Sequence, residues 1–373
     1  MTEITRELIA RVGVDLSKRV YQVHAVDHAG RRVYAKALCV DRFYAWCAEL
    51  PAGCIVAMEA CGGAHHAARR LRLMGLDARL IACHLVTPYR MAGKSGKNDA
   101  NDAAAICEAA SRPHMRFVPV KSAQQQAQLL VHRLRAKYMR QRTACINEIR
   151  GLLTEFGLVF AQSPHKLRRV LAQVLEDASN ELPGVARLAL QRAHQHWIAL
   201  EQELQWCDQC VAQHLRGDDN AKRAAKLMGV GPLSASALVA SVGEFKQFAC
   251  AHQFSAWLGL TPSQHSSGAK TSLGRITKRG DSYLRMLLIQ GAKSAVFSAA
   301  KRSDPISRWL VALTARAGWQ KAAVALANKN ARILWAMFTR GTTFDPQHVP
   351  QVPAARRAPA RPAAAAAAVM AAT

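Results

Sequence analysis

The chain has 373 residues, of which 51 are Lys or Arg and 25 are Asp or Glu, giving a formal net charge of +26. Hydrophobic residues make up 50% of it, which excludes a disordered tail and predicts two or three globular domains. A positive charge of this size indicates a polyanionic partner, either nucleic acid or an anionic membrane. No apolar run is long enough to cross a bilayer, and the opening MTEITRELIARVG lacks the hydrophobic core of a secretion signal. We therefore expect nucleic acid as the partner, no membrane, and a cytoplasmic location.

The first forty residues alternate between apolar and polar side chains, as strands do. Residues 11–16 (RVGVDL), 20–26 and 31–40, with turn residues at 27–30, predict a three-stranded antiparallel meander. The elements expected next are a helix at 41–50, a buried strand at 54–58, a helix at 64–74 and a strand at 78–82. Three antiparallel strands followed by alternating helix and strand is the order of the ribonuclease H fold.

Acidic residues recur at the ends of these elements. Asp99 and Asp102 begin an Ala-rich helix in the stretch 94–110 (KSGKNDANDAAAICEAA), and their spacing places them on one helix face. Taken alone, they could simply cap the helix and interact with its dipole. Asp15 and Glu59, however, end two apolar strands. Carboxylates from two strand ends and one helix are the oxygen ligands that Mg²⁺ prefers, so we expect a divalent metal site.

Histidine and cysteine give weaker metal signals. Cys207, Cys210 and His214 have a spacing that could bind zinc, but a structural zinc site needs four ligands and no second Cys-x-x-Cys occurs. His65 and His66 follow Glu59, and we expect them to face the surface or a phosphate rather than a metal. The ten cysteines lie mostly in apolar surroundings, which is typical of reduced thiols in the cytosol.

The middle of the chain predicts long helices, at 122–157, 165–179 and 182–215. In the first, the apolar residues at helical spacing are Leu129, Leu130, Leu134, Tyr138, Cys145, Ile149 and Leu152. In the last, they are Trp197, Leu200, Leu204 and Val211. Such helices pack as a hairpin or coiled coil that serves either as a spacer or for dimerisation. On the second interpretation, the arginines offered to a nucleic-acid backbone are Arg133, Arg135, Arg140, Arg142 and Arg150.

Two glycine-containing motifs follow. Gly229 and Gly231 separate two helical segments, as in a helix-hairpin-helix that contacts phosphate or as in a tight turn without a ligand. Ser266, Ser267 and Gly268 then lie in an expected Gly-rich loop surrounded by basic residues, namely Lys270, Arg275, Lys278, Arg279 and Arg285. A serine that attacks phosphate needs positive charge around it. The alternative is a phosphate-binding basic loop with structural serines.

Four motifs in this order resemble a known family. GVDLSK around Asp15, MEACGGAHH around Glu59, KNDANDA, and GLTPSQHSSG with LGRITKRGDSYLR resemble the DEDD transposases of insertion sequences, relatives of the Piv DNA invertase and bridge-RNA-guided recombinases. The resemblance extends to about Gly341. It implies an α/β plus α fold: a ribonuclease H or RuvC-like catalytic domain at 1–120, a helical coiled-coil linker at 121–216, and a mostly α transposase domain at 217–345. The Ala-, Pro- and Arg-rich tail at 346–373 matches nothing in the family, and we expect it to be disordered.

The resemblance also implies residue roles and partners. It makes Asp15, Glu59, Asp99 and Asp102 the magnesium-binding catalytic tetrad, and makes Ser267, next to Gly268, the nucleophile in preference to Ser266. The basic residues expected to contact nucleic acid are Lys97, Lys270, Arg275, Lys278, Arg279 and Arg285. The implied partners are donor DNA, target DNA and a noncoding bridge RNA, in the bacterial cytoplasm at the nucleoid. The implied assembly is a homodimer that pairs into a tetramer, in which the tetrad of one protomer meets the serine of another.

Two other functions fit the same residues. The first is a RuvC-like magnesium-dependent nuclease or Holliday-junction resolvase that uses only the four acids. The second is a scaffold that binds nucleic acid without catalysis, although the presence of all four acids counts against it.

Overall fold

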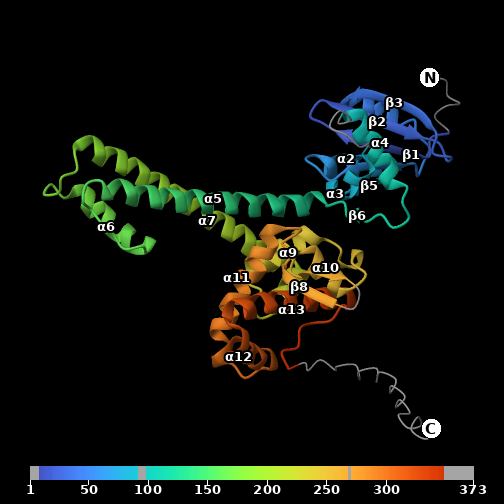
Figure 1. Ribbon diagram of the computed structural model, residues 1–373. Helices are drawn as coiled ribbons and strands as arrows, with labels where there is room; N and C mark the ends of the chain where they lie inside the picture. Colours follow the sequence, from blue (N-terminus) through green and yellow to red (C-terminus); the bar gives the residue numbers. More distant parts are fainter. Residues whose placement is uncertain (1–7, 91–97, 268–269, 348–373) are drawn as a thin grey trace, which may run out of the picture.

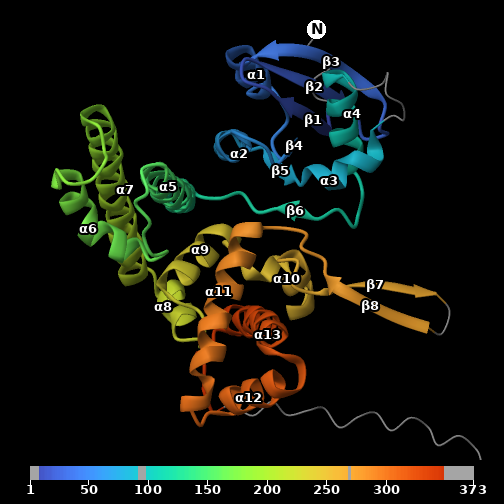
Figure 2. The ribbon, with the colours of Figure 1, turned by 60° about the vertical axis from the view of Figure 1, so that its left-hand side comes forward.

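The computed structural model describes residues 8–90, 98–267 and 270–347. The described residues form an α/β unit, a long helical arm and a mostly helical C-terminal unit (Figures 1 and 2). This arrangement confirms the expected combination of an α/β N-terminal region with a helical remainder. The tail beyond residue 347 and Lys97 lie outside the described residues. None of the helices in the described ranges has the length and apolar character needed to cross a membrane.

The N-terminal unit contains a six-stranded sheet in the order β3-β2-β1-β4-β5-β6 within the described residues. Its strands are β1 (Arg11–Leu16), β2 (Val20–Val26), β3 (Arg32–Cys39), β4 (Ile55–Glu59), β5 (Asp77–Ile81) and β6 (Phe117–Val118). β1 to β3 form the expected antiparallel meander, and β4 and β5 run parallel to β1. The short β6, which pairs with β5 in the antiparallel direction, was not expected. A strand of two residues is too short for alternation of apolar and polar side chains to be recognised in the sequence.

Helices cover both faces of this sheet. They are α1 (Val40–Cys47), α2 (Ala64–Leu73), α3 (Cys83–Val86) and α4 (Asp99–Ala110). Val12 and Val14 of β1 point to the face where Phe43 of α1 and Leu71 of α2 are buried. Successive side chains of a strand alternate, so Gly13 faces the opposite side. That side belongs to α4, whose alanines and Ile106 pack on Ala57 of β4.

At Gly13 the backbone of α4 lies directly against β1. A Cβ atom at Gly13 would lie 2.2 Å from the Ala103 carbonyl oxygen and 2.4 Å from the Cys107 nitrogen. The helix is also tied to the strand, because Arg11 Nε donates a hydrogen bond to the Cys107 carbonyl at 2.9 Å. The absence of a side chain at Gly13 and the small residues of α4 together permit this contact.

The arm consists of α5 (Ala123–Thr154) and α7 (Gly184–Gly217), which run in opposite directions, with α6 (Pro164–Glu176) at its far end (Figure 1). Ser122 and Gln125 start α5 with a capping box. The stripe on α7 is buried as predicted from Trp197 to Val211, but on α5 the prediction is partly wrong, because Leu130 and Leu152 are exposed. The buried face shifts around α5 along its length. Ile146 and Leu153, which were not in the predicted stripe, are therefore buried.

The C-terminal unit packs its helices around one hydrophobic core. The helices are α8 (Asp219–Ala225), α9 (Pro232–Val242), α10 (Ala251–Trp257), α11 (Ser282–Ser298), α12 (Pro305–Ala317) and α13 (Trp319–Arg340). The expected Gly-rich loop is instead a β-hairpin of β7 (Pro262–Ser267) and β8 (Lys270–Ile276), which projects from the helices (Figure 2). Proline, glycine and lysine, which are depleted in strands, occur in this stretch, and this explains why the hairpin was missed.

Close backbone crossings hold the base of the hairpin. A Cβ at Gly259 would lie 2.0 Å from the Arg279 carbonyl oxygen, and one at Gly280 would lie 1.8 Å from that of Trp257. The same constraint applies at Gly229, which packs against Gly291 of α11. Gly229 therefore serves a packed turn between α8 and α9, and contact of this turn with phosphate stays a prediction.

A buried polar cluster joins the arm to the C-terminal unit. His132 of α5 is 1% exposed, and its ring nitrogens contact Ser236 Oγ of α9 at 2.9 Å and the Tyr283 hydroxyl of α11 at 3.2 Å. His214 of α7 contacts the same Ser236 oxygen at 2.7 Å. Burial, followed by the nearby His214, lowers the pKa of His132 to about 4, so its ring is neutral near pH 7. The cluster fixes four helices relative to one another through directed hydrogen bonds.

Replacing Gly13 tests the close contact of α4 with β1. We expect Gly13→Ala to lower the free energy of unfolding by about 2–3 kcal/mol, because the added methyl group meets backbone atoms that cannot rotate away. Denaturant unfolding followed by circular dichroism measures this change. Gly62→Ala is the matched control, because a Cβ at Gly62 meets nothing within 4 Å. Equal stability of the two variants would contradict the proposed contact.

Candidate active site

The strand register brings Asp15 and Glu59 to the same edge of the sheet. β1 and β4 are parallel, with Gly13 aligned with Ala57. Asp15 and Glu59 each lie two residues further along, so both side chains point to the face that α4 covers. Glu59 is the last residue of β4, and both carboxylates are only partly exposed.

The first turn of α4 supplies two further acids. Asn98 caps the helix, its side-chain oxygen accepting a hydrogen bond from the Asn101 backbone N–H at 2.8 Å. Capping is therefore the role of Asn98 and not of Asp99, which corrects the local alternative considered above. Asp99 and Asp102 both lie in the first turn, where the helix dipole favours negative charge. The contact at Gly13, farther along α4, holds this turn against the end of β1.

The four carboxylates interact electrostatically. The pKa of Asp15 is raised to about 6, first because burial disfavours the charged form and then because Asp102, Asp99 and Glu59 repel it. The neighbouring Arg90 acts in the opposite direction and lowers this pKa. Acids remote in the sequence are thus gathered into one negatively charged cluster.

Arg90 is a residue of this site that sequence reasoning missed. It follows the short turn Thr87–Tyr89, and its Nη2 lies 2.8 Å from Glu59 Oε1 while its Nε lies 2.7 Å from Asp102 Oδ1. The contact at Nε is an ion pair without hydrogen-bond geometry. No pattern around Arg90 marked it, because a single arginine in a loop of a strongly basic chain carries no positional signal.

The donor set fits a hard divalent cation. Carboxylate oxygens suit Mg²⁺, and a cluster whose members repel one another gains from any cation placed among them. Arg90 already supplies one positive charge to two of the acids. Among the described residues, no group of three or more His, Cys, Asp or Glu side chains is assembled as a metal-binding site. The cluster therefore has the chemistry of a metal site and is stabilised here by a guanidinium group.

His66 is exposed as expected, whereas the half-buried His65 has a structural contact that was not expected. Its Nδ1 accepts a hydrogen bond from the Lys121 backbone N–H at 3.1 Å, and burial lowers its pKa to about 4. Beside it, Arg69 donates to the Lys121 carbonyl at 2.7 Å. These contacts attach the segment that leads into α5 to helix α2.

Cys207 and His214, two of the residues whose spacing could bind zinc, have other roles in the structure. Cys207 is fully buried in the arm, and His214 Nδ1 is engaged with Ser236. His214 Nε2 lies 3.8 Å from an Asp218 oxygen. Both ring nitrogens of His214 therefore face partners within the protein.

The two serines lie at the end of β7. Ser266 pairs with Thr271 and Ser267 with Lys270 in the register of the hairpin, and both serines are exposed. Ser266 Oγ accepts a hydrogen bond from Gln264 Nε2 at 2.9 Å. In Figure 2 the hairpin extends from the helical unit and does not lie against the six-stranded sheet. Within this chain, the serines and the acidic cluster are not brought together.

The predicted nucleic-acid contacts have different environments. Arg275, Lys278 and Arg279 are exposed on or beside the hairpin. Arg285 is half-buried, and its Nη1 donates to the carbonyls of Leu258 and Arg279 at 3.0 and 3.1 Å. It therefore holds the base of the hairpin rather than facing solvent. The side chain of Lys270 lies outside the described residues.

On the arm, three of the five candidate arginines have partners within the protein. Arg135 pairs with Asp208 at 2.7 Å, Arg142 pairs with Glu201 at 3.4 Å, and Arg150 donates to the Gln162 carbonyl. The sequence could not show this, because Asp208 and Glu201 belong to α7 and Gln162 lies beyond the end of α5.

Two regions of the chain match known protein families. Residues 12–157 match a family described as "Transposase", of the DEDD type found in IS110 elements. Residues 221–306 match "Transposase IS116/IS110/IS902 family". The first region contains the acidic cluster and the second contains the hairpin with its serines. The two matches place the chain among the transposases of insertion sequences.

Relatives match along nearly the whole chain. A "Probable family 20 transposase" of Pseudomonas aeruginosa is 46% identical over 339 residues, covering 91% of this chain and 99% of the relative. The transposase of insertion sequence element IS1111A of Coxiella burnetii is 39% identical, covering 89% and 90%. That of IS1328 of Yersinia enterocolitica is 36% identical, covering 90% and 98%. The chain belongs to the IS116/IS110/IS902 family of transposases.

Because the four acids repel one another, removing one of their charges should raise the free energy of unfolding. The pKa of Asp15 is higher in the folded protein than its usual value near 3.8, so ionisation of Asp15 opposes folding increasingly as the pH rises through about 6. We expect Asp15→Asn to raise the free energy of unfolding near pH 7 in chelator-treated buffer by about 1–3 kcal/mol. Thermal unfolding measures the effect, and the gain should shrink as the pH approaches 4. A loss of stability near pH 7 would contradict the clustering of the acids.

Proposed function

We propose that this transposase cleaves, exchanges and rejoins DNA strands between a donor element and its target, guided by a noncoding RNA. The observation that supports it most directly is the gathering of Asp15, Glu59, Asp99 and Asp102 at one edge of the sheet by β1, β4 and α4. The exposed serines on a basic hairpin in the second matched region support the strand-joining step.

In this proposal the four carboxylates would hold Mg²⁺ beside the scissile phosphate. A metal held there would polarise the phosphodiester and offset the negative charge that develops on its oxygens. Asp15 and Glu59 supply ligands from strand ends, and Asp99 and Asp102 supply them from the first turn of α4. Arg90 neutralises Glu59 and Asp102 until the metal and the DNA arrive.

Ser267 is proposed as the nucleophile. Its Oγ attacks the phosphorus, a serine–phosphate ester forms, and one phosphorus–oxygen bond to the sugar breaks. The departing strand end takes up a proton and leaves as a hydroxyl. Ser266 is the less suitable candidate because its hydroxyl already accepts a hydrogen bond from Gln264. Arg275, Lys278 and Arg279 supply the positive charge that attack on a phosphodiester requires.

The proposed assembly follows from the separation of the two centres. The hairpin extends away from the sheet in Figure 2, which supports a homotetramer, built from dimers, in which Ser267 of one protomer meets the acids of another. A bridge RNA that pairs with donor and target would supply the sequence specificity, and the net charge of +26 suits a complex with both nucleic acids.

Covalent capture of DNA tests this function. We expect the full-length protein, with its copurified RNA and Mg²⁺, to give a protein–DNA adduct that survives denaturing electrophoresis. Ser267→Ala should abolish the adduct, because the proposed serine–phosphate ester can then no longer form, while Ser266→Ala should retain it. Digestion of the RNA before addition of DNA should also abolish it.

Two outcomes would reject parts of the proposal. Normal amounts of joined product from Ser267→Ala would indicate a nuclease or resolvase that uses the acids alone. An adduct that forms equally well after RNA digestion would reject guidance by RNA.

A further inference from the structure

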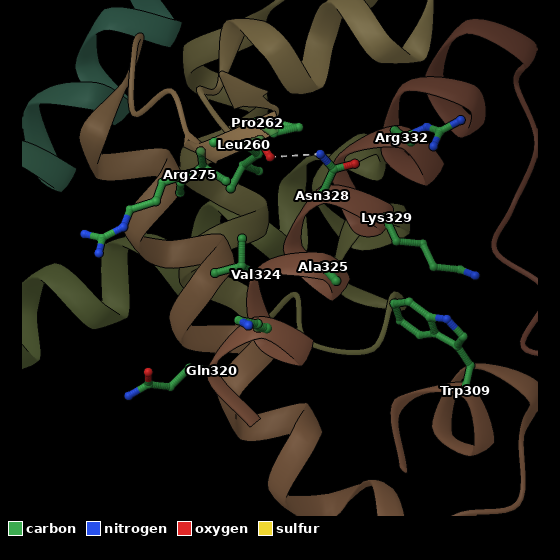
Figure 3. A pocket seen from close by; sticks show the side chains of 13 residues that line it. Leu260, Pro262, Arg275, Trp309, Gln320, Val324, Ala325, Asn328, Lys329 and Arg332 are labelled. Carbon is green, nitrogen blue, oxygen red and sulfur yellow. Dashed lines mark hydrogen bonds between the residues drawn. The ribbon is translucent and has the colours of Figure 1, made fainter. Parts of the chain in front are cut away.

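A basic cavity lies beneath the hairpin, at some distance from both serines. Its volume is about 800 Å³, within the range of ligand sites. It is bordered by the base of β7 and β8 together with α12 and α13 and is open to solvent (Figure 3). Asn328 Nδ2 of α13 donates a hydrogen bond to the Leu260 carbonyl at 3.0 Å, which fixes α13 to the base of the hairpin. The cavity is thus built from segments that the fold holds in place.

The walls of the cavity carry unbalanced positive charge. The basic residues that line it are Arg275, Lys321, Lys329 and Arg332, and the described lining includes no acid. None of these four forms an ion pair with a carboxylate in the described part of the chain. Burial and then the nearby Arg332 lower the pKa of Lys329, as expected where a cation lacks a counter-charge. An anionic group placed here would relieve this repulsion.

The cavity also has an aromatic and apolar part. Trp309 of α12 is only partly buried, and Lys329 Nζ lies 4.7 Å from the centre of its ring. In Figure 3, Val324 and Ala325 lie between Arg275 on one side and Trp309 with Lys329 on the other. A free phosphate ion would use the cations but not the apolar surface. A nucleotide uses both, because its base stacks on aromatic rings and its phosphates pair with cations.

We infer that this cavity binds one unpaired nucleotide of a nucleic-acid strand, with the base against Trp309 and the adjoining phosphates at Lys329 and Arg332. The inference extends the proposed function and rests on it only for the biological source of the strand. Pro262, which lines the cavity, and Ser267 are the two ends of β7, about 17 Å apart along the strand. A nucleotide held at Pro262 would anchor the nucleic-acid strand at a distance from the phosphate that Ser267 attacks.

Binding of short strands tests the site without any catalytic step. The probes are a fluorescently labelled thymidine strand and a strand of equal charge that lacks bases, measured by anisotropy at elevated salt to suppress non-specific binding. We expect the wild-type protein to prefer the strand with bases. Trp309→Leu should remove that preference, a loss of about fivefold or more for one stacked base. Lys329→Gln should weaken binding of both strands.

The chain offers a matched control pair outside the cavity. Trp319 lies 38% exposed, and Lys293 Nζ lies 5.9 Å from its ring centre. Trp319→Leu and Lys293→Gln should leave the preference for bases unchanged. If they reduce it as much as the cavity variants do, or if Trp309→Leu keeps it, the site is rejected. Unfolding curves exclude loss of fold as the cause, and Lys329→Gln, at a half-buried polar position, preserves the core around Trp309.

Strands of DNA and RNA distinguish the two sources of the nucleotide. Whichever strand shows the larger loss in Trp309→Leu is the one the cavity takes, and absence of loss in both rejects the inference. The result is independent of adduct formation by Ser267. Loss of the adduct with intact base preference would reject the proposed function alone, and the reverse would reject the cavity alone.

Discussion

The close contact of α4 with β1 is the constraint on which the N-terminal unit and its acidic cluster depend. Gly13 leaves no room for a side chain between the strand and the Ala103 carbonyl, so the helix axis is fixed against the sheet. Because the first turn of α4 carries Asp99 and Asp102, fixing the helix also fixes these acids beside Asp15. Small residues on one helix face and one glycine on a strand thus set the position of charges that would otherwise repel one another.

The energetic consequence of this packing is a cluster of carboxylates that needs positive charge. The raised pKa of Asp15 reflects burial and the three neighbouring acids, and Arg90 offsets part of the repulsion. A guanidinium group can pair with two carboxylates and still be displaced, because its contacts are electrostatic and lie at a partly exposed edge. Arg90 therefore supplies part of the positive charge that favours this cluster, and the carboxylates remain chemically suited to a divalent cation.

Sequence patterns predicted those features that depend on local periodicity. The meander, the two later strands and the acidic helix followed from apolar patterns and from the spacing of Asp99 and Asp102, and the helix hairpin followed from the stripe that includes Trp197. Features that depend on remote contacts were not predictable. Arg90, the pairing of Arg135 with Asp208, and the polar cluster around His132 each join residues that no local pattern connects. The hairpin was missed because its residues are those of turns as much as of strands.

The most direct test of the account is whether the four acids bind a divalent ion as one site. Binding of Mn²⁺ to the full-length protein can be followed by the paramagnetic resonance signal of the free ion, with Glu59→Gln compared with Glu108→Gln, whose side chain lies on the exposed part of α4 paired with Arg112. The account predicts saturable binding in the wild-type protein and in Glu108→Gln and strongly weakened binding in Glu59→Gln. Equal binding in all three would contradict it.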